Sequence, residues 1–162
     1  MASGARAADV WVANLGIFYW GADEHRRKSL LLRDLKVLRD VHSRIPVEER
    51  PLLFWRETSA ESFPTRKGDF PHGVPSSRLW RVPETQCKEA PTWWNPYNNL
   101  TNAVMKSWGY TILPVHEVSR VGWRDLRGWH YRLDCVHYCM PSGVLDYWVD
   151  VLVEGILDAR AV

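Results

Sequence analysis

A short segment near the C-terminus carries most of the residues that could do chemistry. Residues 132–148 read RLDCVHYCMPSGVLDYW, and Asp134, Cys135, His137 and Cys139 stand close together within it. Three kinds of site use such residues: a metal centre, the acid–base half of a Ser-His-Asp triad, and a disulfide-stapled turn. The three alternatives imply different proteins.

The cysteine pattern argues against a structural zinc site. Cys135 and Cys139 have the spacing of one ligand pair, and His116 and His130 could join them. A structural zinc site usually combines one such pair with a second one. The remaining cysteine, Cys87, stands by itself, so the second pair is absent. We therefore expect no bound metal.

The Asp-x-x-His spacing fits the acid–base half of a triad. In a triad the carboxylate orients the imidazole, which takes a proton from a Ser or Cys nucleophile. Asp134 and His137 can face one point if they lie on a turn ahead of a helix, and they stand just before Pro141 and a helical pattern. The spacing alone is common, and an ordinary surface turn would also contain it.

The elements that must position this segment alternate along the chain. Apolar runs predict buried strands at 9–16, 51–55 and 110–115. Amphipathic patterns predict helices at 23–45, 98–109 and 143–157. Such alternation predicts an α/β domain in which helices cover a parallel sheet.

Polar residues stand at the predicted strand ends. Asn14, Arg56 and His116 each follow or lie close to the end of a strand. Ligands of parallel sheets bind beyond the carboxyl ends of the strands, so we expect Asn14 and Arg56 to face a substrate. Three strands make a thin sheet, and we expect a further part of the domain upstream.

The segment 56–97 has no periodicity and is rich in Pro, Gly, Ser and Trp. A loop this long inside a compact domain is usually functional. Its aromatic and basic side chains include Trp80, Trp93, Trp94, Tyr97, Arg66, Lys67 and Arg78. The aromatic rings would suit stacking on sugar faces, and the basic groups would suit acidic sugars. Packing over a sheet edge is the alternative interpretation.

Composition narrows the function classes. The 162 residues, 46% hydrophobic and 25% charged, predict one folded domain spanning 1–162. A net charge of +2 is too small to favour nucleic acid or an anionic membrane surface as a partner. No run approaches the roughly 20 apolar residues of a membrane span, and the start lacks the apolar core of a signal peptide.

Three segments resemble sequence blocks of the plant trichome birefringence-like proteins, in the PC-esterase branch of the SGNH hydrolases. DCVHYCMPSGVLDYW is similar to D-C-S-H-W-C-L-P-G-x-x-D-x-W, with Ser142 as one inserted residue. FWRETSAESF is similar to F-F-R-T-x-S-P-x-H-F, and DVWVANLGIFYW is similar to D-V-L-x-F-N-T-G-H-W-W. Together with the place of Cys87, the resemblance spans nearly the whole chain.

The resemblance implies a three-layer α/β/α, flavodoxin-like fold. It implies transfer or hydrolysis of O-acetyl groups on polysaccharides such as xylan, pectin or mannan, in the Golgi lumen or the cell wall. Asp134 would orient His137, His137 would be the general base, and Asn14 would donate to an oxyanion. The family implies no bound cofactor, although a transferase would use an acetyl donor such as acetyl-CoA or an acetylated intermediate as co-substrate.

The Gly-Asp-Ser motif that carries the family's nucleophile does not occur in these 162 residues. The one Gly-Asp pair is Gly68-Asp69, which Phe70 follows, and Ser59 matches a family Ser that is not the nucleophile. The chain therefore resembles the C-terminal part of the domain, and we expect it to be inactive by itself. A non-catalytic glycan-binding relic of the same fold is the alternative function.

The resemblance also implies a disulfide. Three cysteines allow at most one internal bond. Cys87 would pair with Cys135 or Cys139 and tie the long loop to the catalytic turn. Closing a loop of about 50 residues would stabilise the fold by a few kcal/mol in an oxidising compartment.

Overall fold

The computed structural model of the protein describes residues 9–15, 24–60, 62–63, 88–89, 97–122, 138 and 143–161. The chain divides into two compact units. The first comprises Met1–Thr58, Tyr97–Leu113 and Val153–Val162, and the second comprises Ser59–Pro96 and Pro114–Leu152.

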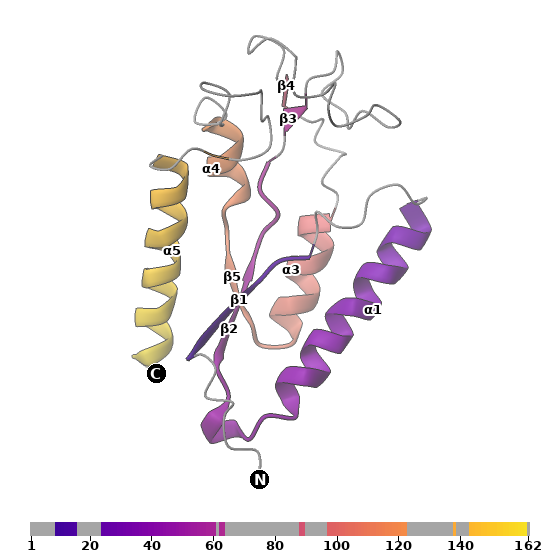
Figure 1. Cartoon of the computed structure of the whole chain (residues 1–162), viewed down its shortest axis with the longest axis vertical. Helices are drawn as coiled ribbons and strands as arrows, with labels where there is room; N and C mark the ends of the chain where they lie inside the picture. Colours follow the sequence, from indigo (N-terminus) through magenta and orange to yellow (C-terminus); the bar gives the residue numbers. More distant parts are fainter. Residues whose placement is uncertain are drawn as a thin grey trace. The chain divides into compact units, whose positions relative to one another are not determined.

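The first unit is built on a three-stranded parallel sheet. Its strands are β1 (Val10–Ala13), β2 (Leu52–Arg56) and β5 (Thr111–Leu113), in the order β1-β2-β5 (Figure 1). Val12 pairs with Phe54 of β2, and Phe54 pairs with Thr111 of β5. The parallel sheet predicted from the alternating pattern is therefore confirmed for these strands.

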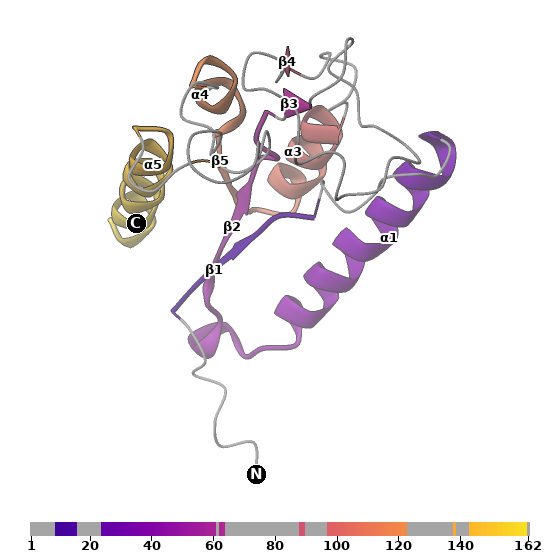
Figure 2. The same ribbon diagram turned by 45° about the horizontal axis from the view of Figure 1, so that its top comes forward.

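Two helices cover one face of this sheet. Helix α1 (Glu24–Ser43) connects β1 to β2, and α3 (Tyr97–Ser107) lies between β2 and β5 in the chain. Both lie on the same side of the strands in Figures 1 and 2, as expected when right-handed connections advance in one direction along a parallel sheet. The core between them contains Leu31 and Leu35 of α1, Trp55 of β2, and Tyr97 and Met105 of α3.

The end of helix α5 (Gly143–Arg160) covers the opposite face of the sheet. Phe54 alternates with Trp55 along β2, so its ring points away from α1 and α3. A Cβ atom built on Gly155 would lie 2.8 Å from the Phe54 ring. The absence of a side chain at Gly155 therefore lets the helix approach the sheet closely. Within this unit the sheet has a helical layer on each side.

The second unit holds a two-stranded antiparallel ribbon, β3 (Ser62–Phe63) and β4 (Lys88–Glu89), and helix α4 (His116–Val121). Tyr138 and Val144 form a small buried core, with Leu145 and Trp148 packed against it. The rings of Tyr138 and Trp148 meet edge to face at 5.7 Å. The Tyr138 hydroxyl donates to the Ser119 carbonyl oxygen at 2.8 Å and lies 3.2 Å from the Ala60 carbonyl oxygen.

Replacing Tyr138 with Phe should lower the free energy of unfolding by about 1 kcal/mol, because two buried carbonyl groups lose their shared donor. Urea unfolding of the variant and the original chain measures the difference. Tyr147→Phe is the matched control, because the Tyr147 side chain on α5 is 40% exposed. Equal losses in the two variants would contradict the anchoring role of Tyr138.

The three long helices and the strands of the parallel sheet were predicted from the sequence, and the remaining elements were not. Helices α1, α3 and α5 confirm the three predicted helices, with ends shifted by up to three residues. The 3-10 turn η2 (Val47–Glu49), α4 and the β3–β4 ribbon were not predicted. Each is too short for periodicity to show, and the ribbon depends on pairing between distant segments.

The interpretation of Tyr97 as a sugar-stacking residue of the long loop is wrong. Tyr97 is the first residue of α3 and is only 5% exposed. Its ring packs in the core with Leu35 and Trp55. Trp93, Trp94 and Tyr97 stand close together in the sequence. Their residue types alone do not show which of them is exposed and which is buried.

Candidate functional site

Polar side chains gather where β1 and β2 end. We call Asn14, Glu57, Thr58, Asn98 and Asn102 the carboxyl-edge cluster. Asn14 directly follows β1, and Glu57 and Thr58 directly follow β2. Asn98 and Asn102 are four residues apart on α3 and therefore share one face of that helix. Ligands of parallel α/β sheets bind at this edge, which makes the cluster the candidate site.

Asn14 ties the end of β1 to the end of β2. Its Nδ2 donates to the Arg56 carbonyl oxygen at 2.8 Å and to the Thr58 hydroxyl oxygen at 3.1 Å. A side-chain amide has two N–H donors, so both are engaged. Asn14 lies at the strand edge, where it was expected. To donate to an oxyanion, it would have to exchange one of these two bonds for the new one.

Asn98 holds the main chain of Thr58 by two hydrogen bonds. The Thr58 N–H donates to Asn98 Oδ1 at 2.9 Å, and Asn98 Nδ2 donates to the Thr58 carbonyl oxygen at 2.9 Å. Both residues are buried, so these main-chain groups need partners inside the protein. The side chain of Asn98 thus pairs with the chain beyond β2 as a neighbouring strand would. Asn98 thereby holds in place the main chain of Thr58, the residue whose hydroxyl accepts a hydrogen bond from Asn14.

Glu57 supplies the carboxylate of the cluster. Its main-chain N–H donates to the Leu113 carbonyl oxygen at 3.1 Å and so extends the pairing of β2 with β5. Its Oε1 accepts a hydrogen bond from Asn102 Nδ2 at 2.7 Å. The cluster therefore combines amides, a hydroxyl and a carboxylate, which are the groups that bind sugar hydroxyls in proteins.

Arg56 places a partly buried cation at the same strand end. Burial lowers the pKa of its guanidinium from the ordinary value. Arginine nevertheless stays protonated in proteins, so a positive charge remains there in reduced contact with water. Such a charge gains more from a nearby anion than an exposed one does. Arg56 is the last residue of β2, and its role toward a substrate stays a prediction.

The residues predicted for the triad, for the disulfide and, apart from Tyr97, for the aromatic and basic surface of the long loop lie outside the described residues. These are Arg66, Lys67, Arg78, Trp80, Cys87, Trp93, Trp94, Asp134, Cys135, His137 and Cys139. Their roles therefore stay predictions. His116 begins α4, and Ser59 lies at the start of the second unit. Across the described part of the chain, no three His, Cys, Asp or Glu side chains are grouped so that they could hold a metal ion.

Glu57, Thr58, Asn98 and Asn102 were not predicted as site residues from the sequence. Thr58 stands in a loop, and the two Asn residues stand in a predicted helix whose polar face looked ordinary. The one available signal was their spacing of four residues, which places two amides on one side of a helix. No feature of the neighbouring sequence indicated that this side of α3 contacts the residues directly after β2.

Comparison with known proteins does not identify the chain. No protein-family model, curated protein or solved structure matches it significantly. None of the helices in the described segments has the length and apolar character needed to cross a membrane.

Proposed function

We propose that the chain is part of an SGNH-hydrolase-like O-acyltransferase or esterase, of the trichome birefringence-like type, that acts on polysaccharide hydroxyls in the secretory pathway or cell wall. One observation carries the proposal. Between Asp134 and Trp148, an Asp-x-x-His motif, two cysteines, a proline and a tryptophan follow one another in the order typical of that family.

The fold of the first unit supports this proposal. Its strand order, with α1 and α3 on one face and the end of α5 on the other, is compatible with one side of a doubly wound, flavodoxin-like sheet. Asn14 follows β1, where the family resemblance puts an oxyanion donor. The second unit contributes Tyr138, which is buried and hydrogen-bonded and directly follows His137 in sequence.

The proposed chemistry is acyl transfer through a serine ester. The Asp134 carboxylate orients the His137 ring, and His137 takes the proton of a serine hydroxyl as that oxygen attacks the acetyl carbonyl. His137 then protonates the leaving group, and it later activates the glycan hydroxyl or water that cleaves the acetyl-serine ester. An oxyanion donor such as Asn14 would contribute about 10²–10³ to kcat. The serine would come from a Gly-Asp-Ser motif outside these residues.

A glycan-binding protein of the same fold without catalysis is the second candidate. One observation favours it. Both N–H groups of Asn14 are engaged by Arg56 and Thr58. In this case the strand-end amides and the loop aromatics would bind sugar without turning it over.

The test uses the full-length protein of the reading frame that encodes these residues, supplied with acetylated xylan and pectin oligosaccharides. Mass spectrometry of the oligosaccharides measures acetyl loss or transfer. His137→Ala should lower kcat by about 10³-fold or more, because the serine loses its base. His25→Ala, an exposed position on α1, is the control and should leave turnover unchanged.

Two outcomes would contradict the catalytic proposal. Turnover that survives His137→Ala would show that another group is the base. Oligosaccharide binding without turnover in the full-length protein would favour the glycan-binding candidate.

A further inference from the structure

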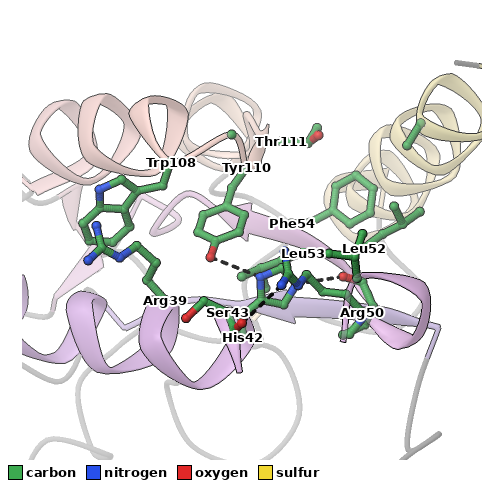
Figure 3. A pocket seen from close by; sticks show the side chains of 14 residues that line it. Arg39, His42, Ser43, Arg50, Leu52, Leu53, Phe54, Trp108, Tyr110 and Thr111 are labelled. Atoms are coloured by element: carbon green, nitrogen blue, oxygen red, sulfur yellow. Dashed lines mark hydrogen bonds between the residues drawn. The ribbon is translucent and has the colours of Figure 1, made fainter. Parts of the chain in front are cut away.

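A pocket of about 580 Å³ lies at the other end of the sheet, where β2 and β5 begin. Its walls come from the end of α1, the turn after α3, the first residues of β2 and β5, and Ala159 of α5 (Figure 3). Small-molecule sites in proteins typically enclose about 300–1,000 Å³. The pocket is therefore large enough for a ligand with one ring.

The lining of this pocket is basic. Arg39 and Arg50 carry positive charge in its lining, and none of its lining residues is acidic. Asp40 lies outside the lining and pairs with Arg39 at 3.5 Å, but these side chains are 45% and 40% exposed, so water weakens the pair. The charge distribution therefore favours an anion over a cation.

Arg50 already neutralises the helix end that faces the pocket. One of its Nη atoms donates to the carbonyl oxygens of Ser43 and Ile45 at 3.2 and 3.0 Å. The Ser43 carbonyl belongs to the last residue of α1, and Ile45 lies two residues beyond it. The partial negative charge of this helix end would otherwise repel an anion. The Nε of Arg50 is buried and has no acceptor among the described residues. Arg50 lines the pocket, so its positive charge still attracts an anion there.

Arg39 and Trp108 form a flat, positively charged wall. The guanidinium carbon of Arg39 lies 4.7 Å from the centroid of the Trp108 ring. In Figure 3 the two planar groups lie together at one end of the pocket, and Leu52 and Phe54 lie at the other. A planar cation backed by an indole favours a flat ring or a carboxylate as its next neighbour.

His42 and Tyr110 satisfy each other between these two ends. His42 Nε2 lies 3.0 Å from the Pro51 carbonyl oxygen, which can only accept, so this nitrogen carries the proton. His42 Nδ1 then accepts from the Tyr110 hydroxyl at 3.2 Å. Burial raises the pKa of Tyr110, while Arg39 and Arg50 act in the opposite direction. Arg39 and Arg50 are thus the positively charged groups of the lining that a ligand anion would meet.

We propose that this pocket binds a small anion with a flat ring, of the aryl carboxylate class. The ring would stack on the Arg39–Trp108 wall, and the carboxylate would point from there toward the guanidinium group of Arg50. The pocket lies at the opposite sheet edge from the carboxyl-edge cluster, so this inference does not depend on the proposed acyl transfer.

Binding of three probes to the 162-residue chain, measured by ligand-detected NMR and calorimetry, tests the proposal. Benzoate carries both ring and charge, benzyl alcohol carries only the ring, and acetate carries only the charge. Benzoate should bind at least about tenfold more tightly than either of the others. Equal binding of benzoate and benzyl alcohol, or no benzoate binding at millimolar concentration, would overturn the proposal.

Variants locate the binding. Arg39→Gln and Trp108→Leu should each weaken benzoate binding by about tenfold. Arg39 is partly exposed, so its replacement should leave the fold intact, which circular dichroism checks. Arg44→Gln is the matched control, because Arg44 is exposed near the end of α1 and does not line the pocket. An equal loss in Arg44→Gln and Arg39→Gln would also overturn the proposal, because binding would then follow overall charge.

Discussion

Replacing Asn98 with Ala should lower the free energy of unfolding by about 2–4 kcal/mol. The variant removes the two hydrogen bonds that Asn98 makes to the buried N–H and carbonyl of Thr58. A buried polar group that loses its partner costs its full desolvation free energy, which is more than the net gain from making the bond. Urea or guanidinium unfolding of the purified chain measures the change.

One further variant separates the hydrogen bonds of Asn98 from its size, and a second, at Asn102, is the control. Asn98→Asp keeps the size and can still accept from the Thr58 N–H, but it cannot donate to the Thr58 carbonyl. It should therefore also be destabilising at neutral pH. Asn102→Ala on the same helix face removes a bond to the Glu57 carboxylate and should cost about 1 kcal/mol or less. A loss in Asn102→Ala as large as in Asn98→Ala would contradict the assigned role.

Leu35→Ala should destabilise the first unit by about 2–5 kcal/mol. The Leu35 side chain is fully buried and packs against the sheet and α3 in the same core as Trp55 and Met105. Removing its outer carbons loses their transfer free energy and leaves a cavity that rigid neighbours fill only in part. Thermal and denaturant unfolding of the variant measure this loss.

Leu32 on the same helix provides the matched control. Its side chain is 38% exposed, so the same substitution removes fewer buried contacts. Leu32→Ala should therefore cost well under half of the loss in Leu35→Ala. Similar losses at the two positions would contradict the assignment of Leu35, and not Leu32, to the buried face of α1.

Most helices and strands of the first unit were predictable because they depend on residues that are close together in the sequence. The spacing of Leu31, Leu35 and Leu38 gives one apolar side to the helix that contains them, whatever surrounds it. The apolar runs of β1, β2 and β5 likewise predict strands buried on both faces. Two crossovers with intervening helices then leave a parallel sheet as the simplest arrangement.

The candidate site was predictable only in part. Asn14 and Arg56 could be placed at strand ends by counting along the chain. Their hydrogen-bond partners could not be predicted in this way. Asn14 and Thr58 are 44 residues apart, and Thr58 and Asn98 are 40 residues apart. Hydrophobic periodicity is evaluated within a window of about 11–18 residues and therefore cannot predict contacts between residues so far apart.

The sequence by itself determined the order of the main elements, the parallel sheet of the first unit and the segment at 134–139 that could do triad chemistry. These follow from residue types and spacings over a few turns of chain. The tertiary structure decided that Asn98 closes the end of β2, that Tyr97 belongs to the core, and that Arg39, Arg50 and Trp108 share a pocket. Each of these depends on packing between segments far apart in the chain, where burial and hydrogen-bond satisfaction select the partner.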